Sequence, residues 1–264
     1  MPGRGASPLP YDCANIGAVN LLLIDPMELA PDGTCTVHDR RATHLRSVLG
    51  ARIGSHVRAG VIGGGIGRAE LLTDDGVAIR VRLMLVDPTP APLPVELVLA
   101  IPRPKVLTRV IETAAAFGVA RIALTNAWRV EKSYLRSPRL EPAALAHAAR
   151  LGAEQGGTTW LPEIGVHRRL MQLLDERWPG PPMLKLVAHP GAPPIEDAIP
   201  GTPVALVLAI GPEGGWIARE VDTFVERGFT AISLGTPILR VENAVAAALG
   251  QLLLLRRLAR ITSS

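Results

Sequence analysis

The stretch AIGPEGGWIARE, Ala209–Glu220, ends an apolar run with a cluster of glycines. Residues 204–210, VALVLAI, predict a buried strand of a parallel sheet. Residues 211–215 then break the strand, and Glu213 places a carboxylate between a proline and two glycines. Ligands of open parallel sheets bind beyond the carboxyl ends of the strands, where glycines let the backbone approach them. The stretch therefore indicates an α/β fold with a site at a strand end.

A second loop of this kind follows the next short strand. Residues 231–235 read AISLG, and the segment LGTPILRVEN, residues 234–243, leads into an apolar helix. Leu234, Ile238 and Leu239 offer an apolar wall beside free glycine backbone groups. This combination suits a flat heteroaromatic ligand such as adenine. Two ordinary turns are the alternative for either loop taken alone.

The proline-rich run DPTPAPLP, residues 87–94, divides the chain, because four prolines disfavour helix and central strand. Before it we expect one helix near residues 40–49 and short strands at 18–24, 55–62, 67–75 and 77–86, typical of a small β-barrel or sandwich. After it we expect strands at 95–102, 121–126, 183–189, 204–211 and 231–235, alternating with helices at 105–119, 141–157, 217–229 and 242–260. Such alternation predicts a mainly parallel sheet covered on both faces. We place the two domains at residues 1–88 and 92–264.

Composition is compatible with an anionic partner. The 264 residues carry a formal net charge of +4, and only three of the 28 basic residues are lysines. Cys13 and Cys35 form no CxxC pair, which predicts a reduced cytosolic protein. The N-terminal residues lack a signal-peptide core, and the apolar run Ala244–Leu255 is too short to span a bilayer. We therefore expect a cytoplasmic protein without a membrane segment.

Three other chemistries lack their signatures. Ser233 lies in a degenerate nucleophile elbow, but no Asp or His follows it in the chain. The six histidines are scattered and form no metal-ligand motif, so we expect no metal site. The glycine-rich segment GVIGGGIGRAE has neither the P-loop lysine nor the GxGxxG spacing, because Arg68 stands where the third glycine belongs.

The two strand-end loops resemble the 16S rRNA uridine-N3 methyltransferase family of the SPOUT class. The family pattern Ile-Gly-Pro-Glu-Gly-Gly matches residues 210–215, and Leu-Gly-x-x-Ile-Leu-Arg-x-Glu-Thr-Ala matches residues 234–244. The segments HLRSVLG from His44, AIPRPKVL from Ala100 and GAEQGG from Gly152 extend the resemblance over nearly the whole chain. Departures are Asn243 for the usual Thr, Ala116 for a Glu, and Thr158 and Thr159 where a basic residue is usual.

The resemblance implies a PUA-like β-barrel that grips RNA, followed by a SPOUT domain with a C-terminal trefoil knot. It also implies a homodimer that uses S-adenosylmethionine (SAM) to methylate N3 of a uridine in 16S rRNA of the small ribosomal subunit. The alternatives are a SPOUT enzyme that acts on 23S rRNA or tRNA, and an inactive RNA-binding protein of the same fold.

Site residues follow from the same match. The resemblance implies that SAM contacts Ile210, Gly211, Pro212, Glu213, Gly214, Gly215, Leu234, Gly235, Ile238, Leu239 and Asn243. Arg240 is our candidate for orienting the uracil or stabilising its developing negative charge. Glu242 or Glu213 is the candidate proton acceptor, and the alternative is that each caps a helix, Glu213 the one near Trp216 and Glu242 the last one.

Basic residues gather in two segments. Residues 103–139 hold eight arginines and lysines against two glutamates, and five arginines lie in residues 40–58. Such clusters neutralise phosphates, and a solvated basic face is the alternative. An aromatic content of 3% argues against a base-stacking platform, so we expect shape and phosphate contacts. The candidate RNA contacts are Arg41, Arg46, Arg103, Lys105, Arg129 and Lys132.

Overall fold

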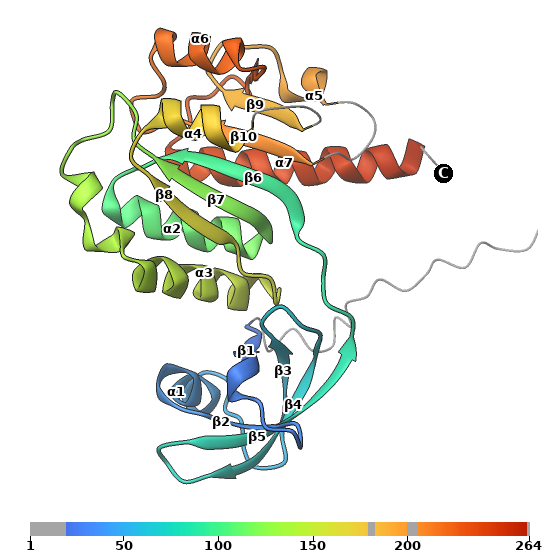
Figure 1. Cartoon of the computed structure of the whole chain (residues 1–264). Coiled ribbons are helices and arrows are strands. Elements are labelled where there is room, and N and C mark those ends of the chain that lie inside the picture. Colours follow the sequence, from blue (N-terminus) through green and yellow to red (C-terminus); the bar gives the residue numbers. More distant parts are fainter. Residues whose placement is uncertain (1–19, 179–182, 200–204, 263–264) are drawn as a thin grey trace, which may run out of the picture. The chain divides into compact units, whose positions relative to one another are not determined.

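The structure is a computed structural model that describes residues 20–178, 183–199 and 205–262 (Figure 1). The chain separates into two compact units, Met1–Pro88 and Thr89–Ser264, and each has its own apolar core. Cys13 lies outside the described residues, whereas Cys35 is a buried, free thiol whose pKa burial raises to about 11. No helix in the described ranges is long and apolar enough to cross a bilayer.

The first unit contains one mixed sheet and the helix α1 (Asp39–Ser47). Its strands are β1 (Leu22–Ile24), β2 (Thr34–Val37), β3 (His56–Val61), β4 (Ile66–Asp74) and β5 (Ile79–Asp87), in the spatial order β1-β3-β4-β5-β2. Only β1 and β3 pair in parallel. Ile79 and Val81 of β5 are buried while Arg80 and Arg82 are exposed, as the period of two predicts. The predictions missed β2, whose sequence TCTV has little apolar content.

The second unit is an α/β domain with a six-stranded, wholly parallel sheet. Its strands are β6 (Leu93–Ala100), β7 (Val119–Thr125), β8 (Glu163–His167), β9 (Leu184–Ala188), β10 (Leu206–Ile210) and β11 (Thr230–Ile232). The spatial order is β11-β9-β10-β6-β7-β8, so β10 and β6 occupy the centre. The prediction of a parallel sheet in an α/β fold is confirmed.

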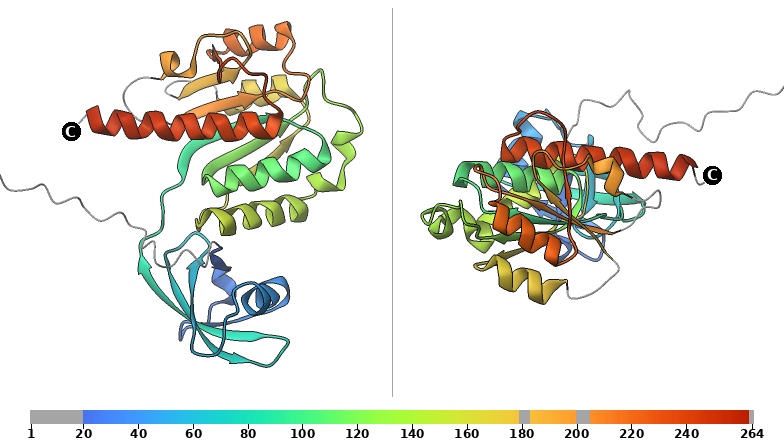
Figure 2. Two further views of the ribbon diagram at one scale, coloured as in Figure 1. Left: turned by 180° about the vertical axis from the view of Figure 1, so that it is seen from behind. Right: turned by 90° about the horizontal axis from the view of Figure 1, so that it is seen from above.

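Helices cover both faces of this sheet. They are α2 (Pro104–Ala116), α3 (Pro142–Gly156), α4 (Leu170–Arg177), α5 (Ile195–Ala198), α6 (Ala218–Glu226) and α7 (Val241–Thr262), with the short 3-10 helices η3 (Tyr134–Arg136) and η4 (Pro138–Leu140); the first unit adds η2 (Pro26–Glu28). Figure 2, in the view from above, shows α2, α3 and α7 on one face and α4 and α6 on the other. The predictions missed α4, because its apolar residues fill only two turns.

The prediction that residues 87–94 exclude a central strand is wrong at its end. Central strand β6 begins at Leu93 and includes Pro94. Regular pairing with β10 starts only at Val95, and the pairing with β7 is irregular between Leu93 and Glu96. The missing N–H of Pro94 therefore interrupts no regular ladder.

One carboxylate is buried in the second core and fixes α4 to the sheet. Glu96 of β6 is 5% exposed. It accepts a hydrogen bond from Trp178 Nε1 at 3.1 Å and another from Arg177 Nε. A buried charge needs such donors, because an unpaired one would lose several kcal/mol of hydration. The end of α4 is thereby held against β6.

Two glycines let α3 lie unusually close to α2. A Cβ atom on Gly152 would lie 2.1 Å from the carbonyl oxygen of Glu112, and one on Gly156 would lie 2.3 Å from that of Ala116. Neither neighbour is a flexible side chain, so any side chain here would push the helix backbones apart. The α2–α3 contact therefore requires glycine at both positions.

We predict that Gly152→Ala lowers the free energy of unfolding by about 2 kcal/mol, because overpacking must displace α2. Gly250→Ala is the matched control, since Gly250 lies in helix α7 with no atom within 4 Å of its would-be Cβ. It should raise stability by about 1 kcal/mol through helix propensity alone. Denaturant unfolding measures both variants, and equal stability changes would contradict the close-approach explanation.

Candidate active site

A cavity lies at the carboxyl edge of the parallel sheet. Because all six strands of the second unit run in parallel, their carboxyl ends share one edge. The loops that follow β9, β10 and β11 meet there and enclose about 320 Å³. This volume is in the range of small-molecule sites.

Ten of the eleven residues predicted to contact a cofactor line this cavity, and Asn243 is the exception. The GPEGG loop forms one wall, and Leu234, Gly235, Ile238 and Leu239 form another. Ile238 is 81% exposed, which leaves its side chain available to a ligand at the rim. Asn243 is exposed in the first turn of α7, outside the lining set.

The sequence predictions missed several lining residues. These are Ala188, His189, Pro190, Trp216, Ser233, Pro237, Val241 and Ala244. The first of them ends β9 and the next two follow it, and β9 lies between β11 and β10 in the sheet. The strand-end rule applied to β9 as well as to its neighbours, but the sequence does not give the spatial order of strands. Pro190-Gly191 after an apolar strand was the available signal.

Two buried polar atoms in the lining lack protein partners. Among the described residues, neither His189 Nδ1 nor Trp216 Nε1 has a hydrogen-bond partner. Trp216 is 3% exposed, and its ring packs edge-on against Phe224 with centroids 4.9 Å apart. Buried polar groups in native proteins nearly always have partners. Their presence here is consistent with a polar ligand in the cavity, and the glycine-rich walls fit such a ligand.

Glu213 contacts a different helix from the one expected. Its Oε1 accepts the backbone N–H of Arg103 at 2.9 Å, and Arg103 is the N-cap of α2. The helix after the GPEGG loop is α6, and Glu220 caps it by accepting the N–H of Ile217 at 3.0 Å. Glu213 thus fastens the loop to the start of α2 and does not cap the helix that follows it.

Two further contacts join the GPEGG region to the loop after β7. Arg129 Nη1 donates to the carbonyl oxygen of Gly214. The backbone N–H of Trp128 donates to Glu220 Oε1 at 2.8 Å, so this carboxylate bridges Trp128 and Ile217. The cavity wall is therefore held by contacts from the ends of two other strands, β6 and β7.

Arg240 and Glu242 lie at the start of α7. The carbonyl oxygen of Arg240 accepts the N–H of Ala244 at 2.8 Å, and its guanidinium is exposed. Leu239 and Val241, on either side of Arg240, both line the cavity. Glu242 is half-buried in the first turn of α7. Neither Arg240 nor Glu242 is part of the lining, although both adjoin it in the chain.

Two of the predicted RNA contacts are engaged in ion pairs of the first unit. Arg41 Nη2 lies 2.5 Å from Glu28 Oε1, and Arg46 Nη2 lies 2.5 Å from Asp74 Oδ1. The hydrogen bond from Arg46 lowers the pKa of Asp74 to about 2. By contrast, Arg103, Lys105 and Lys132 are exposed, and no hydrogen bond or ion pair engages their side chains in the part of the chain that the structure describes.

The described residues contain no group of three or more His, Cys, Asp or Glu side chains that could hold a metal ion. The polar groups that line the cavity are backbone groups, the imidazole of His189, the indole N–H of Trp216, the hydroxyl of Ser233 and the carboxylate of Glu213. This set fits an organic ligand with a flat apolar part.

The chain belongs to the RNA methyltransferase domain family, whose model matches residues 89–253. The protein is therefore an RNA methyltransferase. The ribosomal RNA small subunit methyltransferase E of Treponema pallidum is 28% identical over 244 residues, which are 87% of this chain and 89% of that protein. The ribosomal RNA small subunit methyltransferase E 1 of Borreliella burgdorferi is 25% identical over 234 residues, which are 87% of this chain and 95% of that protein.

Solved structures agree in fold over most of the chain. A Legionella pneumophila protein, described as a methyltransferase and solved with the cofactor SAM, superposes with a TM-score of 0.72 at 25% identity, covering 88% of this chain and 96% of that one. The ribosomal RNA small subunit methyltransferase E of Neisseria gonorrhoeae, solved with bound SAM, superposes with a TM-score of 0.71 at 23% identity. The match covers 89% of this chain and 98% of that one.

We predict that Glu213→Ala lowers the free energy of unfolding by about 1 kcal/mol, because the N–H of Arg103 loses its acceptor. Glu213→Gln keeps an acceptor oxygen, so its free energy of unfolding should fall by less than half as much. Glu131→Ala is the control, because Glu131 is also an exposed loop glutamate and its side chain has no partner among the described residues. Thermal unfolding measures the three variants, and an unchanged Glu213→Ala would rule out the fastening role.

Proposed function

We propose that this protein transfers a methyl group from SAM to N3 of a uridine in the 16S rRNA of the small ribosomal subunit. The observation that carries the proposal is the cavity whose walls are the GPEGG and LGTPIL loops. Relatives named for methylation of small-subunit ribosomal RNA match both domains of the chain and support the choice of RNA. A ribosomal substrate would also imply a cytoplasmic enzyme, which we propose as well.

The cofactor would lie between apolar side chains and free backbone groups. Leu234, Ile238 and Leu239 supply flat contact for adenine, and the glycines of the GPEGG loop supply N–H and C=O groups. His189 Nδ1 and Trp216 Nε1 add two buried polar atoms with unused hydrogen-bonding capacity among the described residues. Asn243 remains a proposed cofactor contact, although it lies outside the lining set.

The reaction needs an anionic nucleophile at N3. Bound SAM would supply a methyl group on a sulfonium, so the proton of N3 would have to leave as the new N–C bond replaces the S–C bond. Arg240, exposed beside the cavity, would stabilise the negative charge that develops on the uracil. Glu213 already accepts the Arg103 N–H, so Glu242 is the better candidate for proton acceptor.

We also propose that the C-terminal segment forms a trefoil knot. After β11 the chain runs beside the loop that follows β9, because Ser233 N donates to Pro193 O at 2.7 Å and Ile195 N donates to Ser233 O at 3.1 Å. The chain then enters α7, and Gln251 of this helix donates back to Leu234 O at 3.0 Å. A chain drawn through the β9–β10 loop would make these contacts.

The first unit would be a PUA-like barrel that grips RNA, as its five strands and single helix suggest. Arg41 and Arg46 remain proposed RNA contacts, although each is held in a half-buried ion pair, with Glu28 and Asp74 respectively. A homodimer is proposed as well. Exposed leucines on α7, Leu253, Leu254 and Leu258, offer an apolar surface for a second copy.

The proposal is tested by methylating rRNA that lacks the modification. Purified protein, SAM and small ribosomal subunits should give one methylated uridine in 16S rRNA. The methyl at N3 blocks Watson–Crick pairing, so reverse transcription should stop one nucleotide before it. Methylation of 23S rRNA or tRNA instead would indicate another RNA substrate. Failure to bind SAM in calorimetry would leave an RNA-binding protein without activity.

We predict that Arg240→Ala lowers kcat about 100-fold, which is the usual loss when a donor to a developing anion is removed. The Kd for SAM should change less than twofold, because the side chain acts on the uracil. Arg240→Lys should restore part of the rate. Arg219→Ala, which removes an exposed arginine from α6, is the control and should leave kcat unchanged. Full activity of Arg240→Ala with an intact fold would contradict the role.

A further inference from the structure

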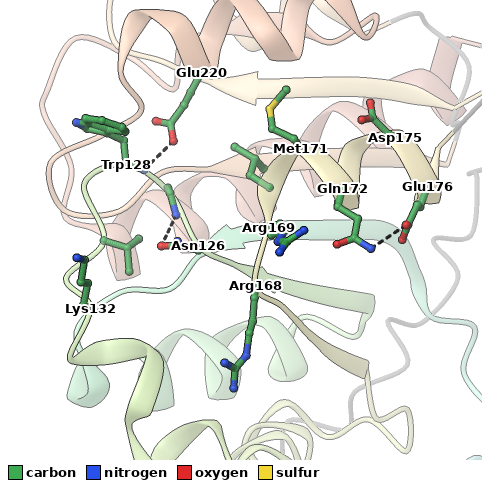
Figure 3. A pocket seen from close by; sticks show the side chains of 13 residues that line it. Asn126, Trp128, Lys132, Arg168, Arg169, Met171, Gln172, Asp175, Glu176 and Glu220 are labelled. Atoms are coloured by element: carbon green, nitrogen blue, oxygen red, sulfur yellow. Dashed lines mark hydrogen bonds between the residues drawn. The ribbon is translucent and has the colours of Figure 1, made fainter.

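A second hollow lies at the carboxyl edge of the sheet, beyond β7 and β8. We call it the Trp128 groove, and its lining includes Asn126, Trp128, Lys132, Arg168, Arg169 and Glu220 (Figure 3). Its volume is about 1100 Å³, more than three times that of the cofactor cavity. It is too large and open for a nucleoside-sized ligand alone, and suits an extended chain.

Trp128 is the exposed aromatic side chain of this groove. Trp128 is 79% exposed, whereas Trp160, Trp178 and Trp216 are buried or half-buried. The loop that carries it is well held, because Trp128 N donates to Glu220 Oε1 at 2.8 Å and Ala127 N to Asn126 Oδ1 at 2.9 Å. A large indole held in water on a fixed loop leaves its ring available for stacking against a ligand.

The basic side chains of the groove are free, whereas its acidic side chains are engaged. Lys132 lies on the loop below Trp128, and Arg168 and Arg169 immediately precede α4 (Figure 3). No hydrogen bond or ion pair engages these three side chains among the described residues. The acidic side chains already have donors: Glu220 accepts two backbone N–H groups, Asp175 pairs with Arg227 at 2.8 Å, and Glu176 accepts from Gln172 at 2.9 Å. The side chains of Lys132, Arg168 and Arg169 are therefore free to bind an anionic partner.

The combination of a flat indole and free cations selects single-stranded nucleic acid. Bases stack on exposed aromatic rings while arginine and lysine neutralise the phosphates. Double-stranded RNA hides its base faces, and an acidic peptide would use the cations but not the indole face. The low aromatic content of the chain predicts no stacking platform, yet one exposed indole is enough for one base.

The groove and the cofactor cavity are linked through Glu220. Glu220 joins Trp128 on the groove side to Ile217, which follows the cavity residue Trp216. Only β6 separates β7 from β10, so the two strand ends are about 10 Å apart. That distance is within the reach of one or two nucleotides. Arg103, which follows β6, lies between the two sites along the edge.

We infer that the Trp128 groove holds a single-stranded segment of the RNA substrate, with an unpaired base near the target nucleotide stacked on Trp128 and its phosphates on Lys132, Arg168 and Arg169. This inference rests on the proposed RNA methylation for the identity of the strand. The contact positions the substrate, while the methyl transfer itself belongs to the cavity.

Direct binding is tested with an unstructured oligouridylate and the full-length protein. Stacking should quench the fluorescence of the exposed indole, and Trp128→Phe should lose this quenching while it still binds. Trp128→Ala should raise the Kd roughly tenfold, the usual loss of one stacked base. Unchanged Kd values, or quenching of equal size in Trp128→Phe, would overturn the stacking.

The phosphate contacts are tested by salt dependence. For wild-type protein, log Kd should rise with log salt, and each of Arg168→Ala and Arg169→Ala should reduce the slope by about 0.7. Arg257→Ala is the matched control, because this exposed arginine lies about 24 Å along α7 from Val241. A polyglutamate peptide that binds as tightly as oligouridylate and quenches Trp128 equally would overturn the choice of RNA in favour of an acidic protein partner.

The enzymatic readout separates this inference from the proposed function. Trp128→Ala should raise KM for the RNA substrate about tenfold while the Kd for SAM stays within twofold. If the wild-type protein methylates no 16S rRNA yet binds oligouridylate through Trp128, the proposed function is wrong and the inference about the groove is supported. If methylation proceeds and Trp128→Ala leaves KM unchanged, the groove fails and the proposed function stands.

Discussion

Parallel pairing of β10 between β9 and β6 is the constraint on which the catalytic half of the molecule depends. All five residues of β10 are buried, and both of its edges are hydrogen-bonded to parallel neighbours. Since every strand of the sheet then runs the same way, the loops after the strands must meet at one edge. The positions of the cavity, of the Trp128 groove and of the exposed Arg103, Arg168 and Arg169 all follow from that arrangement.

The cavity wall is stiff because neighbouring strand ends hold it. Glycines free the backbone of residues 211–215 to face a ligand, but such backbone has little order of its own. Glu213 bonds to the start of α2, Arg129 bonds to Gly214, and Glu220 links Trp128 to Ile217. These contacts tie the methyl-donor site to the surface that we assign to RNA.

Particular residues show how far sequence reasoning reached. The strand-end rule pointed to the two loops, because glycine clusters after apolar runs are local signals, and the family resemblance supplied the ten residues that line the cavity. They missed His189, whose strand β9 lies beside β10 only through the order of the sheet. They missed α4 because its fixing contact, Glu96 with Trp178, joins residues 82 positions apart. Trp128 gave no signal, since exposure is a property of the folded surface.

The sequence by itself determined the two-part organisation, the parallel α/β class and the two loops that form the cavity, because periodicity and turn residues act over short distances. Tertiary structure alone decided the order of the strands, the partner of Glu213 and the exposure of Trp128. Each of these depends on which distant segments pack together. In particular, the carboxylate that looked like a cap for the next helix serves a helix that begins more than one hundred residues earlier.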